Sequence, residues 1–186
     1  NGRKYLDTIN NVAHVGHENE SVVIEGQNQM SILNTNSRYL HKSINELAEE
    51  IIQTLPEKLN VIHFVNSGSE ANELAVRMMK SHTGSNDIIV SENGYHGNTN
   101  ICVDISSYKF DGKGGKGAPE NTHVIPMPTK FNGKHKGEEA CEGYINEIKN
   151  SIKNLKSKNR DLGGFIIEPI ISLSLIHISE PTRPSK

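Results

Sequence analysis

Residues 64–73 read FVNSGSEANE, and this stretch decides the fold of the chain. The run from Val61 to Val65 is β-branched and aromatic, which indicates a buried strand. Four small polar residues, 66–69, interrupt it, and an apolar pattern of helical period follows from Glu70 to Lys80, with acids in the first turn. The sequence therefore predicts a strand, a turn containing Gly68, and a helix.

A strand, a short turn and a helix N-terminus in succession can bind an anion. The backbone N–H groups of a first helical turn point outward, and Gly68 permits close approach of a ligand. Ser67 and Ser69 add hydroxyl donors. The alternative is a serine N-cap on an ordinary crossover helix. From these residues alone, both interpretations stay open.

The length and composition favour one domain and argue against several classes of partner. A chain of 186 residues can bury one sizeable core, and its net charge of -2 comes from mixed signs, so we expect neither nucleic acid nor an anionic membrane as a partner. No apolar stretch approaches the roughly 20 residues that a membrane span needs. Cys102 and Cys141 suggest no disulfide framework, and we predict no metal site, although His14 and His17 are close in sequence. A cytoplasmic or mitochondrial-matrix location is compatible with these features.

Strands alternate with helices along the rest of the chain, which predicts a doubly wound, largely parallel sheet. A Ser43-x-x-Glu46 capping box opens the second expected helix. The expected helices are 21–33, 43–54 and 137–158, and the further strands are a short one within 2–7, then 87–91, 123–126 and 163–169. Between the second expected helix and the first lies a polar loop, residues 34–41.

Residues 112–117 match the dinucleotide-binding pattern G-x-G-x-x-G. No expected strand leads into this match, and Ala118-Pro119 follows it instead of a helix. We therefore interpret it as an exposed glycine- and lysine-rich loop, which disfavours a nucleotide-binding function.

Two motifs together resemble the class III aminotransferases, pyridoxal-phosphate enzymes of fold type I. They are FVNSGSEANE at 64–73 and GYHG at 94–97. Two earlier stretches, NNVAHVGH at 10–17 and NTNSRYLH at 34–41, resemble the branch that holds ethanolamine-phosphate phospho-lyase and alanine-glyoxylate aminotransferase 2-like proteins. The resemblance covers about residues 1–171. It implies a pyridoxal-phosphate-binding large domain with an N-terminal segment of the small domain.

The resemblance also implies roles for individual residues. Gly68 and Ser69 match the family positions that bind the cofactor phosphate, and Tyr95 matches the aromatic residue that stacks on the cofactor ring. His96, its neighbour, is expected either to shape the pocket or to fix the loop. Glu168 matches an acid beside substrate and cofactor, and its alternative is a strand-end acid facing water. The family's imine-forming lysine and its aspartate have no matching motif here, so no catalytic residue is identified.

The end of the chain departs from the family pattern. After Glu168-Pro169 the family continues with a glycine-rich turn, whereas residues 172–186 resemble translated vector or adapter sequence. We therefore expect a C-terminally truncated enzyme with three parts. They are an N-terminal segment (1–45), a partial cofactor-binding domain (46–171) and a non-native tail (172–186).

Three functions are compatible with these motifs. The first is a pyridoxal-phosphate-dependent aminotransferase acting on a small amine or amino acid, a homodimer when full length. The second is a phospho-lyase that eliminates phosphate from phosphoethanolamine or a similar phosphorylated amine. It would need a second anion site, and Arg38 in the polar loop is the candidate residue because a guanidinium binds phosphate through two donors; the alternative is a solvated surface arginine. The third is a phosphate-binding fragment without catalysis.

Overall fold

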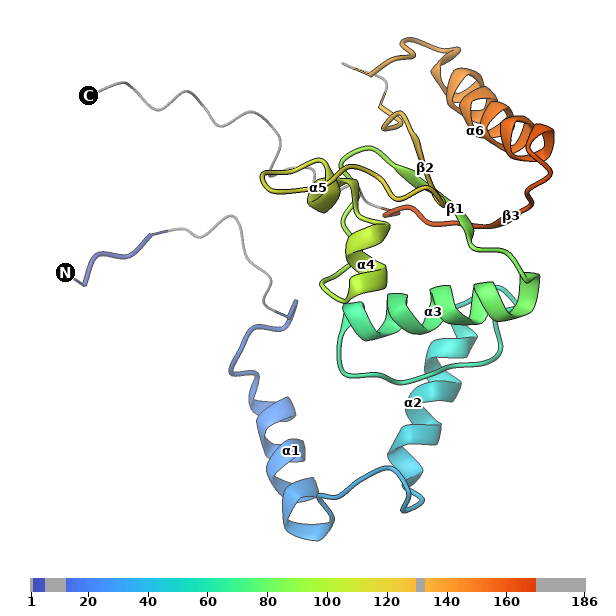
Figure 1. Cartoon of the computed structure of the whole chain (residues 1–186). Coiled ribbons are helices and arrows are strands. Elements are labelled where there is room, and N and C mark those ends of the chain that lie inside the picture. Colours follow the sequence, from blue (N-terminus) through green and yellow to red (C-terminus); the bar gives the residue numbers. More distant parts are fainter. Residues whose placement is uncertain (1, 6–12, 130–132, 170–186) are drawn as a thin grey trace. The chain divides into compact units, whose positions relative to one another are not determined.

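The computed structural model describes residues 2–5, 13–129 and 133–169. The chain divides into two compact units, residues 1–62 and 63–186 (Figure 1). The tail 172–186, Ile170 and Ile171, and residues 10–12 of the first family motif lie outside the described residues. The expected domain boundary between residues 45 and 46 stays a prediction. None of the helices formed by the described residues is long and apolar enough to cross a membrane.

The first unit contains two helices joined by a loop, as expected. Helix α1 spans Glu20–Ile32, and α2 spans Lys42–Gln53. The predicted Ser43–Glu46 capping box is wrong, because α2 begins before Ser43 and its N-cap is His41, whose Nδ1 accepts from the Ser43 N–H at 3.3 Å. Glu46 instead forms an ion pair with Lys42 at 2.7 Å. Residues 2–5 form no strand, and the rest of the strand expected within 2–7 lies outside the described part of the chain.

The second unit is built on a parallel sheet of three strands. They are β1 (Asp87–Ser91), β2 (Thr122–Ile125) and β3 (Leu162–Phe165), in the order β2-β1-β3, so β1 is central. Both neighbours pair with β1 in parallel. This confirms the predicted parallel α/β sheet, although β3 ends before Glu168, earlier than expected.

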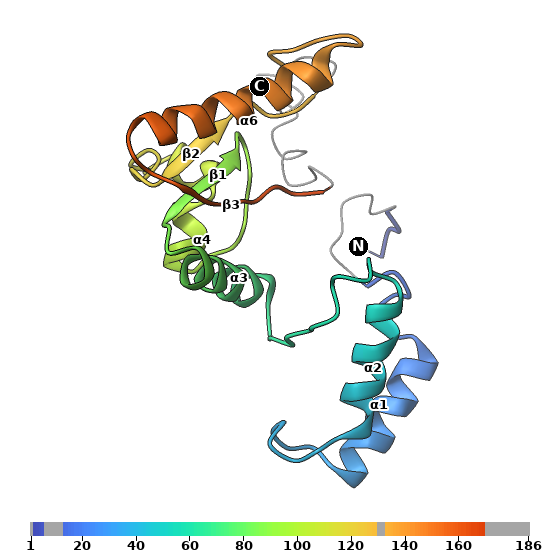
Figure 2. The ribbon, with the colours of Figure 1, turned by 90° about the vertical axis from the view of Figure 1, so that its right-hand side faces the viewer.

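Helices cover both faces of the sheet (Figures 1 and 2). One face carries α3 (Gly68–Thr83) and two short helices, α4 (Asn100–Asp104) and α5 (Ser107–Phe110). The other face carries α6 (Ala140–Ser157). Gly84 ends α3 in the left-handed conformation, with φ of 71°, which glycine adopts without steric cost.

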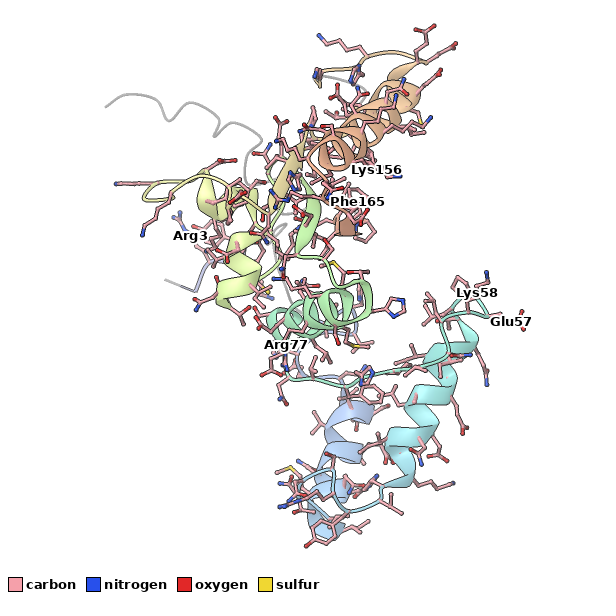
Figure 3. All side chains as sticks on the ribbon, turned by 45° about the vertical axis from the view of Figure 1, so that its right-hand side comes forward. Arg3, Glu57, Lys58, Arg77, Lys156 and Phe165 are labelled. Carbon is pink, nitrogen blue, oxygen red and sulfur yellow. The ribbon has the colours of Figure 1, made fainter. Side chains whose placement is uncertain are left out.

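The strand period of two distributes the core over these two layers. Ile88 and Val90 point to one face and form a buried cluster with Val76 of α3, Ile105 and Phe110. Ile89, fully buried, points to the opposite face. On α3, the residue after Val76 is exposed: Arg77 lies on the side of the helix away from the sheet (Figure 3).

The strand predicted at Val61–Val65 is wrong. These residues have no regular secondary structure, and Val61 is 75% exposed. A strand needs a hydrogen-bonded neighbour, and residues 61–65 pair with none of the three strands of the sheet. Their β-branched and aromatic composition therefore indicates a preference that pairing does not realise here.

A buried carboxylate joins the N-terminal end of β1 to two other segments. Asp87, 5% exposed, accepts from Arg160 through both oxygens at 2.7 and 2.9 Å, and it contacts His123 Nε2 at 2.6 Å. Burial alone would raise the pKa of Asp87, but the hydrogen bonds and charges of His123 and Arg160 outweigh it and lower the pKa below its usual value. We call these three residues the Asp87 clamp.

Candidate functional site

The first turn of α3 has the donors of an anion site. Ser67 is its N-cap, and Ser67 Oγ accepts from the Glu70 N–H at 3.1 Å. The Glu70 carboxylate in turn accepts from the Asn66 N–H at 2.7 Å. The N–H groups of Gly68 and Ser69 donate to none of the described residues, so they are available to a ligand. A Cβ placed on Gly68 would have nothing within 4 Å, so the space beside it is open.

The loop after β1 packs directly against this turn. Ser69 Oγ accepts from the Asn98 N–H at 3.1 Å, and Asn72 of α3 donates to the His96 carbonyl at 2.8 Å. A Cβ on Gly97 would lie 2.6 Å from Ser69 Oγ and 2.9 Å from Ser69 Cα, and Gly97 has a φ of 128°. Only glycine allows this close approach at that backbone angle. The Ser69–Gly97 contact therefore fixes the loop at the N-terminus of α3.

Glu168, in the segment after β3, contacts the loop after β1 at Tyr95. The Tyr95 N–H donates to Glu168 Oε1 at 2.8 Å, although 73 residues separate them in sequence. Both side chains are half-buried. The loop 94–97 thus carries contacts to Ser69 on one side and to Glu168 on the other.

The loop residue His96 has a buried side chain. It is 5% exposed, its backbone N–H donates to Ser106 Oγ at 2.8 Å, and its Nε2 atom is buried with no hydrogen-bond partner among the described residues. Burial lowers the pKa of the His96 imidazole, and the charge of Glu168 opposes that shift only in part. An imidazole in this position is held in its neutral form near pH 7.

Sequence reasoning missed the residues that support the loop from α5. Ser107 Oγ donates to the Ser91 carbonyl at 2.8 Å and accepts from the Gly94 N–H at 2.9 Å. Tyr108 meets the Tyr95 ring edge to face, with centroids 5.9 Å apart. The Lys109 ammonium lies 5.4 Å from the Tyr95 centroid. These residues carry no recognisable motif, and only the three-dimensional arrangement associates them with Tyr95.

The structure thus brings together five of the six residues singled out from the sequence: Gly68, Ser69, Tyr95, His96 and Glu168. Arg38 belongs to the first unit, where its Nε donates to Asn36 Oδ1 at 3.1 Å, and its role stays a prediction. Among the described residues, no group of three or more His, Cys, Asp or Glu side chains could hold a metal ion.

Comparisons with known proteins identify relatives of the chain. The chain is 39% identical over 176 residues to the alanine–glyoxylate aminotransferase 2-like protein of Drosophila melanogaster, an alignment that covers 92% of this chain and 36% of that protein. The structure of a phospholyase from Arthrobacter in complex with phosphoethanolamine superposes with a TM-score of 0.78 at 30% identity, covering 90% of this chain and 39% of that one. The chain therefore spans little more than a third of the length of these relatives.

A more distant structure supports the fold alone. The taurine:2-oxoglutarate aminotransferase of Bifidobacterium kashiwanohense, in complex with pyridoxal phosphate and glutamate, superposes with a TM-score of 0.66 at 17% identity. It covers 82% of this chain and 35% of that chain. The parallel sheet with helices on both faces is thus part of the fold type I architecture.

The family profile described as "Aminotransferase class-III" matches residues 1–180. It extends past residue 171 into the tail that the sequence analysis sets aside. The match includes both motifs that meet at the Ser69–Gly97 contact. The chain belongs to the class III aminotransferase family.

Proposed function

We propose that this chain contributes the phosphate-binding turn and the ring-stacking residue of a pyridoxal-phosphate-dependent aminotransferase that acts on a small amine or amino acid. The observation that carries this proposal is the Ser69–Gly97 contact. Gly97 lies two positions after Tyr95 in the loop, so its contact with Ser69 places that loop against the first turn of α3. A phosphate group and an aromatic ring of one ligand could therefore be bound by neighbouring parts of one loop and one helix.

The residues at the N-terminus of α3 fit the cofactor phosphate. The free N–H groups of Gly68 and Ser69, the Ser69 hydroxyl and the positive end of the helix dipole all favour a dianion. Tyr95 fits the cofactor ring, because an aromatic face can stack on a pyridinium.

Bound pyridoxal phosphate would withdraw electrons from the carbon that carries the substrate's amino group. The chain's own residues would position the cofactor ring and the substrate. Tyr95 would cover one face of the ring and exclude water from it. Glu168, fixed by the Tyr95 N–H, would present a carboxylate to the substrate's side of the loop. The buried neutral imidazole of His96 would keep the loop in place without adding a charge.

A second candidate function is phosphate elimination from phosphoethanolamine or a similar phosphorylated amine. The likeness to the Arthrobacter phospholyase supports it, since this is a match at 30% identity and a TM-score of 0.78. The same phosphate-binding turn and ring-stacking residue would serve both reactions, so they do not decide between them. Arg38 is the residue from the sequence analysis that we propose for the substrate phosphate.

We also propose that the whole protein is a homodimer, as the family resemblance implies. Light scattering on the purified protein would give its mass in solution. A monomer at micromolar concentration would contradict this assignment.

Two measurements test the function. Equilibrium dialysis of pyridoxal phosphate against the purified protein tests the cofactor, and a Kd in the micromolar range or below is expected. The reaction is then tested in the whole protein, since no imine-forming lysine is identified in this chain, with an amino acid plus a keto acid and separately with phosphoethanolamine. Amino transfer without release of phosphate supports the first candidate. Release of phosphate and ammonia, lost in Arg38→Ala, supports the second. A protein that does not bind the cofactor would refute both.

A further inference from the structure

A buried segment, residues 102–106, connects the first turn of α3 to the loop after β1 from the interior of the second unit. It includes the end of α4, which packs against the N-terminal end of α3 (Figure 1). The Cys102 side chain is fully buried, and its Sγ donates to the Ser69 carbonyl at 3.4 Å. The Thr99 hydroxyl, at the N-cap of α4, accepts from the Cys102 N–H at 3.3 Å. Cys102 therefore joins α4 to the same residue of α3 that contacts Gly97.

Ser106 continues this connection to the loop. It follows the last residue of α4 by two positions and is fully buried. Its Oγ donates to the Cys102 carbonyl at 2.5 Å and accepts from the His96 N–H at 2.8 Å. A serine hydroxyl has a single O–H donor, and here both that donor and an acceptor lone pair are engaged. The Ser106 side chain is thus fixed in one orientation, and it fixes the backbone of the residue next to Tyr95.

Three hydrogen bonds therefore run in series from Ser69 through Cys102 and Ser106 to His96. Both bonds of Ser106 are buried, so water does not compete for them. The bond between Ser69 Oγ and the Asn98 N–H, which joins the same turn to the same loop, is exposed to solvent. The interior series is thus the better protected of these two connections.

The neighbouring residue Ser107 makes a different connection. It is also buried, but its two hydrogen bonds reach the Ser91 carbonyl and the Gly94 N–H. These bonds join the loop to its own strand, β1, and neither of them reaches α3. Of the two serines, Ser106 is the one in series with Ser69.

We propose that Ser106 is a positioning residue that sets the distance between the phosphate-binding turn of α3 and the Tyr95 ring. This inference rests on the proposed function, in which the phosphate of one ligand binds at Gly68 and Ser69 while its ring stacks on Tyr95. A rigid ligand gains from both contacts only if their separation matches its own. Ser106 does not touch the ligand, and it acts on Tyr95 through the backbone of His96.

Two ligands and a double-mutant cycle test the proposal in the whole protein. Inorganic phosphate occupies the turn alone, whereas pyridoxamine phosphate also carries the ring and cannot form an imine with a lysine. Ser106→Ala should weaken pyridoxamine-phosphate binding about threefold to tenfold in calorimetric titration, the part of the affinity that stacking supplies. The affinity for inorganic phosphate should change by less than about twofold. In a Tyr95→Ala background, Ser106→Ala should have little further effect, because the ring that it positions is gone.

Thr122→Val is the matched control. Thr122 is also buried, and its Oγ1 donates to the carbonyl of Asp104, the last residue of α4, at 2.9 Å. It begins β2, at the end of the sheet opposite to the loop after β1. The variant therefore also removes a buried hydroxyl that bonds to α4, but it does not cut the series. It should leave the affinity for pyridoxamine phosphate within about twofold.

The circular dichroism of the bound cofactor's own absorption band gives a signal that does not depend on affinity. At saturation it should weaken in Ser106→Ala as it does in Tyr95→Ala, and it should stay unchanged in Thr122→Val. Ser106→Cys has a thiol that fills the same space with weaker hydrogen bonds. It should shift both readouts in the same direction by a smaller amount, and it provides the test if the alanine variant does not fold.

Several results would overturn the proposal. Equal losses for the two ligands, or a Ser106→Ala effect that persists in full without Tyr95, would make Ser106 a general stabilising residue. An equal loss in Thr122→Val would have the same meaning. Unchanged affinity and circular dichroism in the Ser106 variants would remove its role altogether. In each case the proposed function stands, because the wild-type protein binds the cofactor. A wild-type protein that binds neither pyridoxal phosphate nor pyridoxamine phosphate overturns both.

Discussion

Replacing Gly97 with alanine tests whether the loop after β1 must touch the first turn of α3. The added Cβ would lie 2.6 Å from Ser69 Oγ and 2.9 Å from Ser69 Cα, and the second of these neighbours is backbone that cannot rotate away. Moving the loop to relieve such a contact costs about 1–3 kcal/mol, as in other overpacked sites. The φ of 128° adds about 1–2 kcal/mol for a residue with a Cβ. We expect Gly97→Ala to lower the free energy of unfolding by about 2–5 kcal/mol.

Gly114→Ala separates the steric cost from the backbone cost. Gly114 also has a positive φ, 84°, but a Cβ there would have nothing within 4 Å. It should lose only about 1–2 kcal/mol. Urea unfolding of both variants gives the difference, and equilibrium dialysis should show that only Gly97→Ala weakens pyridoxal-phosphate binding, by at least about tenfold. If the two variants lose equal stability and bind the cofactor equally, the Ser69–Gly97 contact does not build the site.

Other substitutions test the remaining contacts. Ser69→Ala and Tyr95→Ala should each weaken pyridoxal-phosphate binding by about 1–2 kcal/mol, through a lost hydrogen bond to a charged group and lost stacking respectively; dialysis that detects neither change would refute the cofactor assignment. Asp87→Asn should lower the free energy of unfolding by about 2 kcal/mol at pH 7, because it removes a charged hydrogen-bond acceptor and leaves the partly buried Arg160 with only the exposed Glu120 as an ion-pair partner. Since the folded pKa of Asp87 is lowered, its contribution is complete above its unfolded pKa of about 3.9 and is lost as the pH falls through the folded value. Stabilities of wild type and Asp87→Asn, measured by urea unfolding as a function of pH, should therefore begin to converge as the pH falls below about 4, and parallel curves would refute the clamp. His96 also has a lowered pKa, so wild-type stability should fall as the pH drops below about 6.5, and His96→Gln should remove that slope in urea unfolding at pH 7.5 and 5.5.

The sequence predicts most of the secondary structure of the second unit for local reasons. The apolar runs of β1 and β2, the serine cap before α3 and Gly84 after it are each specified by neighbouring residues. The strand at 61–65 fails because pairing depends on a distant partner, which local composition does not describe. The predicted N-cap of α2 is wrong because His41 and Ser43 both offer a side-chain acceptor, and the earlier of the two caps the helix.

In the candidate site too, features specified by neighbouring residues are predicted, whereas contacts between distant segments are not. The two motifs name Ser69 and Tyr95, and the family resemblance assigns them roles, but neither tells that Gly97 touches Ser69. The contact between Glu168 and Tyr95 spans 73 residues and depends on the register of β3. Ser107 and Lys109 were missed because they lie in a four-residue helix without a sequence motif, and their part in the site depends on contacts with the loop after β1.

The Asp87 clamp has a consequence for the order in which the chain folds. Its bonds join residues 36 and 73 positions apart, so both close long loops and neither can form before β2 and the turn after α6 have reached the sheet. Interactions of this kind are made late and are largely absent from the folding transition state. Removing the carboxylate should then leave the refolding rate nearly unchanged and accelerate unfolding instead. The clamp would thus set how long the sheet lasts once formed, rather than how quickly it forms.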